Sequence, residues 1–121
     1  SDDGKFYHNG TDTYLTSNVG NFRIGCLNDS NIKFSTNNST RWNINGNGHI
    51  IPDANDSFDI GSSSYRVRNI YTNDFHLSNE GGSNDVDGTW GDWTMQEGES
   101  DLFLKNNRSG KKYKFNLTEV S

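Results

Sequence analysis

The stretch that decides the fold is residues 59–77, which read DIGSSSYRVRNIYTNDFHL. Gly61 can adopt a positive φ, and a serine after it can accept hydrogen bonds from N–H groups two or three residues further on, which is how a short helical turn begins. Val67, Ile70 and Tyr71 follow with helical spacing. Beyond residue 70, apolar and polar side chains alternate with a period of two. The stretch therefore predicts one helical turn leading into one strand, because a continuous strand would need a bulge.

The composition supplies little apolar mass for a chain of 121 residues. Hydrophobic residues make up 29%, and Leu, Ile, Val and Phe together number 24, which is close to the composition of disordered chains. The aromatic share of 12%, placed in alternating runs, indicates ordered strands instead. Such a chain can fold if identical copies pool their aromatic faces, so the composition predicts an obligate oligomer.

The residue types predict an all-β fold of short antiparallel strands and tight turns. Ala, Met and Gln occur once each, whereas Asn, Ser, Gly, Asp and Thr dominate, and these residues favour turns and caps. The net charge of −5 disfavours binding to nucleic acid. We expect no membrane insertion and no signal peptide, because no apolar run is long enough to span a bilayer. Since the chain begins at Ser1, we expect an expressed fragment or a processed product.

Residues 1–58 are predicted to form a shaft-like series of short strands, because turn signals recur about every eight to ten residues. The expected elements are an Asn-Gly hairpin at 6–15, a strand through Phe22, Ile24 and Cys26, a strand through Ile32 and Phe34, a strand through Trp42 and Ile44, and a strand at 49–52 that Pro52 ends or keeps at an edge. Cys26 has no partner for an intrachain disulfide and no metal-ligand spacing, so we expect it to be buried as a small apolar residue.

Residues 78–121 are predicted to form a C-terminal β-meander, which the connector at 59–77 precedes. A loop rich in Gly, Asn and Asp is expected at 78–91. Three strands are expected after it, through Trp93 and Met95, through Leu102 and Leu104, and through Tyr113, Phe115 and Leu117.

Four parts of the chain resemble tail fibres and related virion structural proteins of tailed bacteriophages, marine phages in particular. They are FYHNGTDTYL at 6–15 with GNFRI at 20–24, RWNINGNGHIIP at 41–52, DIGSSSYRVRNIY at 59–71, and the closing residues from 91–95 through 110–115. Val67 departs from the pattern, because such proteins often carry Trp or Phe at that position. The resemblance implies an elongated homotrimer in the virion, outside the cell, with intertwined or side-by-side chains and the meander as its tip. It also implies attachment to a bacterial surface glycan or outer-membrane protein, and contact with other virion proteins.

In such a trimer the shared core is expected to contain Val67, Ile70, Tyr71, Phe75, Trp93, Tyr113, Phe115 and Leu117. The histidines His8, His49 and His76 are expected at the surface, although one inward His per chain could meet its copies at the axis and bind a metal or anion. No metal or cofactor is predicted.

The candidate receptor- or glycan-binding residues are an aromatic and acidic pair followed by a basic cluster: Trp90, Asp92, Lys105, Arg108, Lys111 and Lys112. An aromatic ring beside a carboxylate suits a sugar, and clustered cations suit phosphate or carboxylate groups. In the alternative interpretation the basic residues, with Lys114, pair across strands with Glu97, Glu99 and Asp101. Trp93 is expected in the core and Trp90 in the loop.

The acidic loop and the search for catalytic motifs add two expectations. Asp85-Val86-Asp87-Gly88 resembles part of a calcium loop, but Thr94 stands where the bidentate Glu is needed, so a solvated turn is predicted. No nucleophile elbow, phosphate loop or paired metal ligands occur, so we expect no enzymatic activity. Together with what the resemblance implies, this gives a non-enzymatic attachment protein as the expected function. The alternatives are a structural connector or baseplate component of the virion and, third, a fragment of a polysaccharide depolymerase.

Overall fold

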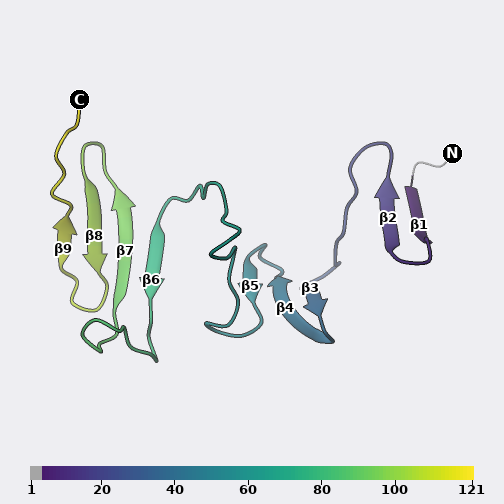
Figure 1. Ribbon diagram of the computed structural model, residues 1–121, viewed down its shortest axis with the longest axis horizontal. Coiled ribbons are helices and arrows are strands. Elements are labelled where there is room, and N and C mark those ends of the chain that lie inside the picture. The colour runs from purple at the N-terminus through teal and green to yellow at the C-terminus, as the bar shows by residue number, and fades with distance from the viewer. Residues whose placement is uncertain (1–3) are drawn as a thin grey trace. The chain divides into compact units, whose positions relative to one another are not determined.

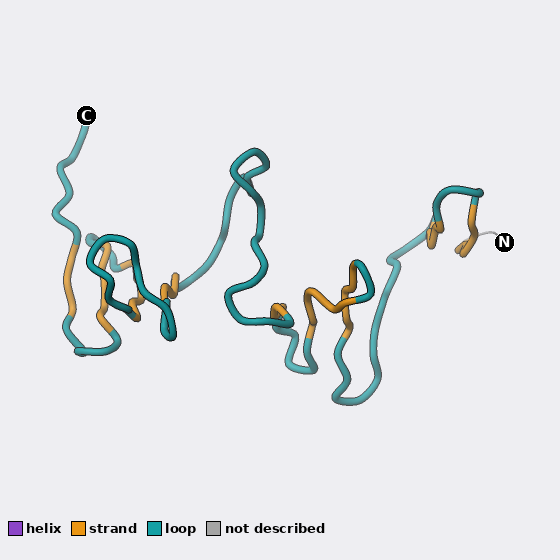
Figure 2. The backbone as a smooth tube through the Cα atoms, turned by 60° about the horizontal axis from the view of Figure 1, so that its bottom comes forward, coloured by secondary structure: helices purple, strands orange, loops and turns teal. Residues whose placement is uncertain are grey.

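The computed structural model describes residues 4–121, and in that range the chain is all-β and antiparallel, as predicted (Figure 1). None of the described residues forms a helix that could cross a membrane. Strands alternate with long loops (Figure 2). The chain divides into two compact units, Ser1–Tyr65 and Arg66–Ser121, which are described separately.

The first unit begins with a hairpin of β1 (Gly4–His8) and β2 (Thr13–Ser17). Tyr7 lies opposite Tyr14, and their rings stack with centroids 5.0 Å apart. The Asn9 side chain closes the turn, because its Oδ1 accepts hydrogen bonds from the backbone N–H groups of Thr11 and Asp12. The predicted Asn-Gly turn is confirmed, but it is a loop of four residues rather than two.

The second sheet of this unit is a meander of β3 (Ile32–Thr36), β4 (Ser39–Ile44) and β5 (Ile50–Pro52). Asn37 and Asn38 turn the chain between β3 and β4 with φ of 50° and 57°, a left-handed pair that matches the twist of a hairpin. Trp42 lies between Phe34 and Pro52 in the register. Pro52 ends an edge strand, as predicted.

One predicted strand of this unit is wrong. Residues 21–26 form no strand, and Cys26 is exposed rather than buried. The alternation of Phe22, Ile24 and Cys26 with polar residues satisfies the side-chain pattern of a strand. A strand also needs a neighbour to bond its backbone, however, and β3 pairs with β4 instead.

The second unit contains a four-stranded meander of β6 (Phe75–Ser78), β7 (Asp92–Glu97), β8 (Leu102–Asn106) and β9 (Lys112–Lys114). The predicted three-stranded meander is confirmed and gains β6, the strand expected at the end of the connector. The final strand is shorter than predicted, although the N–H of Phe115 still donates to the carbonyl of Leu102.

The helical turn predicted after Gly61 is wrong, and the strand begins at Phe75 rather than near residue 70. Gly61 has φ of 87°, and Ser62 Oγ accepts a hydrogen bond from the N–H of Tyr65, both as expected. The N–H of Ser62, however, donates to the carbonyl of Tyr65, which closes a loop. Serine, β-branched and aromatic residues cannot offset the cost of nucleating so short a helix without packing.

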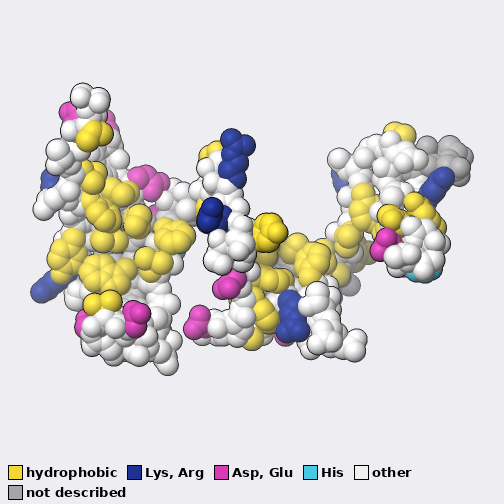
Figure 3. Space-filling view, viewed as in Figure 1, with side chains coloured by type: hydrophobic (Ala, Val, Ile, Leu, Met, Phe, Trp, Pro, Cys, Tyr) yellow, Lys and Arg dark blue, Asp and Glu magenta, His cyan; other side chains and the backbone are white. Residues whose placement is uncertain are grey.

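The β6–β9 sheet has one apolar and one polar face. Phe75, Met95, Leu104 and Tyr113 lie directly opposite one another across all four strands. One residue further along each strand, the row is His76, Thr94, Lys105 and Lys112, which belongs to the other face because side chains alternate. Figure 3 shows hydrophobic side chains gathered over β6–β9.

The described residues contain no buried apolar side chain; only Asn43 and Thr94 are buried. The accessible surface of the chain is 11048 Å². Two separate compact units, each of half its mass, would together expose roughly 7,900 Å². The strands therefore pair by hydrogen bonds without enclosing a core, whatever the arrangement of the two units.

The left-handed turn between β3 and β4 gives a stability prediction. Asn38→Val places a β-branched residue at positive φ and is expected to lower the free energy of unfolding by about 1–2 kcal/mol. Asn38→Gly is the matched control and is expected to be neutral or stabilising, because glycine adopts this conformation without strain. Thermal unfolding at fixed protein concentration, followed by circular dichroism, measures both. Equal losses in the two variants would contradict the assigned turn.

Candidate functional site

Trp90 and Arg108, two of the predicted binding residues, lie together. Trp90 lies near the end of the loop between β6 and β7, and Arg108 lies in the turn between β8 and β9. The Arg108 guanidinium carbon is 3.7 Å from the centroid of the Trp90 ring, and Nη1 donates a 2.8 Å hydrogen bond to the Trp90 carbonyl. The guanidinium therefore covers one face of the indole, and the loop and the turn are joined.

This pair borders an open hollow of about 630 Å³, here called the Trp90–Arg108 hollow. Its lining includes Asn84, Asp87, Trp90, Trp93, Asn106 and Arg108. A side chain at Gly91 would crowd one wall of the hollow, because a Cβ there would lie 3.0 Å from Trp93 Nε1. The volume is within the roughly 300–1,000 Å³ range of small-molecule sites.

The loop beside the hollow is ordered by its own side chains. Asn84 Oδ1 accepts from the N–H groups of Val86 and Asp87, and its Nδ2 donates to Asp87 Oδ1 at 2.7 Å. Asp87 Oδ1 also accepts from the hydroxyl and the N–H of Thr89. The Thr89 hydroxyl, followed by Asn84, lowers the pKa of Asp87. The turn predicted for residues 85–88 is confirmed.

The other predicted binding residues lie elsewhere in the unit. Asp92 Oδ1 accepts a 2.8 Å hydrogen bond from Asn107 Nδ2 and does not line the hollow. Lys105 and Lys112 lie directly opposite each other in the row on the polar face. Lys111 follows the turn that carries Arg108. The six residues are thus divided among the hollow, the polar face and the turn.

The alternative interpretation of the basic cluster is confirmed for Lys114 alone, whose Nζ lies 3.4 Å from Asp101 Oδ1. Within residues 4–121, Lys105, Arg108, Lys111 and Lys112 have no carboxylate within ion-pair distance. Directly opposed like charges destabilise a strand pair, so the Lys105–Lys112 pair is unfavourable in the chain by itself.

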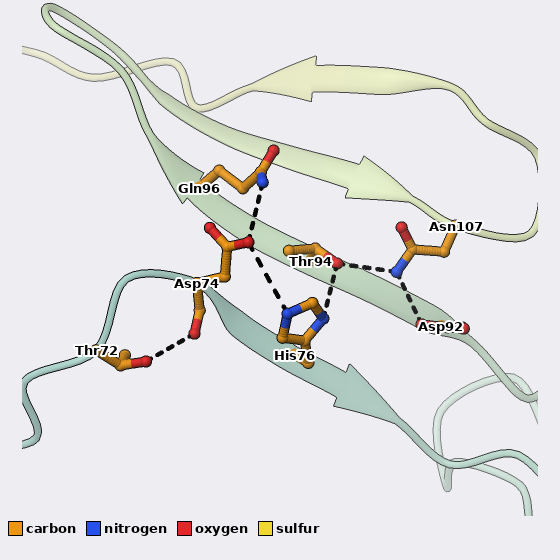
Figure 4. A network of polar contacts seen from close by, with 7 residues as sticks. All are labelled: Thr72, Asp74, His76, Asp92, Thr94, Gln96 and Asn107. Atoms are coloured by element: carbon orange, nitrogen blue, oxygen red, sulfur yellow. Dashed lines mark hydrogen bonds and ion pairs between the residues drawn. The ribbon is translucent and has the colours of Figure 1, made fainter. Parts of the chain in front are cut away.

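A polar network crosses the same face and holds β6 and the β8–β9 turn to β7 (Figure 4). Thr94 is at its centre and is only 3% exposed. Its Oγ1 lies 3.1 Å from His76 Nδ1 and accepts a 2.9 Å hydrogen bond from Asn107 Nδ2. Gln96 Nε2 donates to Asp74 Oδ2, which is 3.9 Å from His76 Nε2. The sequence alone does not reveal this network, because it depends on strand register.

The order Asp74, His76, Thr94 resembles that of a hydrolytic triad, but its geometry is structural. The Thr94 hydroxyl is buried and already has two partners, so it cannot approach a substrate. The three histidines are exposed, as predicted. In the described part of the chain, no three His, Cys, Asp or Glu side chains gather in a way that could hold a metal ion.

Comparison of the chain with models of known protein families, with curated proteins and with solved structures found no match. The function is therefore inferred from the residues and from the geometry of the two units.

The polar network gives a second prediction. Thr94→Val keeps the shape of the side chain but removes the hydroxyl that joins His76 and Asn107, so the free energy of unfolding is expected to fall by about 1–3 kcal/mol. Thr94→Ser retains the hydroxyl and is expected to lose less. Urea unfolding of both variants measures the difference, and a Thr94→Val variant as stable as the parent would exclude a structural role for the network.

The lowered pKa of Asp87 gives a third prediction. Because the folded pKa is below the ordinary 3.8, the loop gains stability above that value and loses it as the pH falls through the folded pKa. Thr89→Val removes the largest cause and is expected to raise the pKa of Asp87 toward 3.8. Carboxyl ¹³C NMR titration measures this, with Thr118→Val as the control. An unchanged Asp87 titration in Thr89→Val would contradict the assigned hydrogen bond.

Proposed function

We propose that this chain is a subunit of a homotrimeric tail fibre of a tailed bacteriophage, and that it attaches the virion to the bacterial surface without enzymatic activity. The observation that carries the proposal is the uncovered apolar face of the β6–β9 sheet in a chain whose described residues include no buried apolar side chain. Because four stretches resemble phage tail fibres, which are homotrimers, we infer that further copies of the same chain cover this face.

The size and chemistry of the apolar face support assembly through it. Phe75 and Tyr113 are 43% and 47% exposed, and the Trp93 and Tyr113 rings lie 5.7 Å apart on the same face. The chain exposes roughly 3,000 Å² more than two compact units would, which is more than an ordinary protein interface buries per partner. Covering this surface with two other copies supplies the core that one chain lacks. In the proposed trimer, Val67, Ile70, Tyr71, Phe115 and Leu117 join that core.

The Trp90–Arg108 hollow is the proposed receptor contact. It combines indole rings with a guanidinium, a carboxylate and amides, the mixture that binds sugars through both their C–H faces and their hydroxyls. In the proposed fibre the C-terminal meander forms the tip, which places this hollow where the bacterial surface is met.

A structural connector in the virion is the second candidate, and the Lys105–Lys112 pair favours it. Two opposed ammonium groups that have no acidic partner within residues 4–121 suit an acidic surface on another virion protein. Such a connector would assemble through the same apolar face but would bind no bacterial surface.

The fourth prediction tests attachment. The assembled chain is expected to bind a glycan on an array or whole marine bacteria, and Trp90→Ala is expected to weaken this binding at least about tenfold while leaving the molar mass unchanged. Val86→Ala is the matched control, because Val86 is 91% exposed in the same loop and does not line the hollow. Its binding should equal that of the parent. A correctly assembled chain that binds neither glycans nor cells would contradict attachment and favour the connector.

A further inference from the structure

We propose that the Trp90–Arg108 hollow, taken as the receptor contact of the attachment function on which this assignment rests, binds a carboxylated sugar, with Arg108 holding the carboxylate. The proposal goes beyond a general glycan site because it names the group that is recognised. It also assigns the stacked guanidinium, rather than the face of Trp90, as the principal contact.

Arg108 is fixed before any ligand arrives. Its guanidinium lies 3.7 Å from the centre of the Trp90 ring, and Nη1 is bonded to the Trp90 carbonyl. Its backbone N–H donates to Asn106 Oδ1, as does the N–H of Ser109, so the turn that carries it is closed as well. A long side chain that is already ordered loses little conformational entropy on binding, which favours affinity.

The guanidinium retains donors and charge that the chain does not use. Arginine has five N–H donors, and one hydrogen bond to the Trp90 carbonyl leaves most of them available. Among the described residues, Arg108 has no carboxylate within ion-pair distance. The planar fork of a guanidinium matches a carboxylate through two parallel hydrogen bonds, a geometry that an ammonium cannot reproduce.

The remainder of the hollow suits the body of a sugar ring. Arg108 occupies one face of Trp90, but the indole of Trp93 also lines the hollow and can pack against C–H groups. Asp87 Oδ1 is saturated by Asn84 and Thr89, whereas Oδ2 has no partner among the described residues and can accept from hydroxyls. Asp87 is ionised at neutral pH, as an ordinary Asp is, and its lowered pKa extends the ionised range to more acidic pH.

The two charges together select the ligand class. A neutral sugar satisfies Asp87 but leaves the guanidinium of Arg108 without a counter-charge. Inorganic phosphate satisfies Arg108 but brings no hydroxyl array for Asp87 and no apolar face for Trp93. A sugar that carries a carboxylate satisfies all three groups within one hollow of about 630 Å³.

The fifth prediction uses paired probes that differ in the carboxylate. We titrate the full, assembled chain with glucuronate and glucose, and with N-acetylneuraminate and its methyl ester, and we follow tryptophan fluorescence and NMR shifts of the indole N–H groups. At least one acid is expected to bind about tenfold more tightly than its neutral partner, and the pair that responds distinguishes a uronic from a nonulosonic acid. Inorganic phosphate at the same concentration should bind more weakly than that acid.

Two variants test whether the planar guanidinium of Arg108 is recognised, rather than positive charge in general or an intact fold. Arg108→Lys keeps the positive charge but loses the fork, and it is expected to remove about tenfold of the affinity for the acid while the circular dichroism spectrum is retained. Lys33→Gln removes a positive charge from β3 in the first unit, is not one of the candidate binding residues, and is expected to leave the affinity unchanged. An Arg108→Lys variant with full affinity would overturn the proposal.

The outcomes also distinguish this proposal from the proposed function. If neutral and acidic partners bind equally, or if no probe binds a chain that still attaches to cells, the carboxylate assignment is overturned and attachment stands. If the assembled chain binds neither the probes nor cells, attachment and the carboxylate assignment both fall.

Discussion

The structure depends on apolar side chains that the described chain does not cover. The row formed by Phe75, Met95, Leu104 and Tyr113 runs across a complete four-stranded sheet, and none of these four side chains is buried. Backbone hydrogen bonds align the strands, but their net contribution to stability is modest, and a lone sheet in water is marginal. In the proposed assembly, the free energy that keeps these sheets folded comes largely from surface that is buried against other copies of the chain.

The proposed assembly and the proposed binding site share one side chain. Trp93 lies opposite Leu77 and Asn106 in the sheet, on the apolar face, and it also lines the Trp90–Arg108 hollow. Covering the apolar face would hold this indole in place, while hydrogen bonds among Asn84, Asp87 and Thr89 order the loop that also lines the hollow. On the polar face of the sheet, the hydrogen bonds of Thr94 to His76 and Asn107 hold β6 and the β8–β9 turn to β7.

Local patterns in the sequence predicted much of the fold, because turns are encoded locally. The Asn-Gly loop and the edge position of Pro52 follow from the residues that occupy them. The patterns failed where the outcome depends on distant partners. Residues 22–26 alternate as a strand would but form no strand, and residues 67–71 have helical spacing but form no helix. Pairing between distant strands also separates the candidate binding residues: Arg108 stacks on Trp90, whereas Lys105 lies opposite Lys112 on the polar face of the sheet.

The most direct test of the central claim is the molar mass of the purified chain, measured by light scattering over a wide dilution range beside a Met95→Lys variant. Met95 lies in the middle of the apolar row, so a charge there should oppose burial between copies. Our account predicts three times the chain mass of 13.6 kDa for the parent, and dissociated, unfolded chains for the variant. A parent that is monomeric, compact and cooperative in unfolding, with a variant of equal mass, would contradict it.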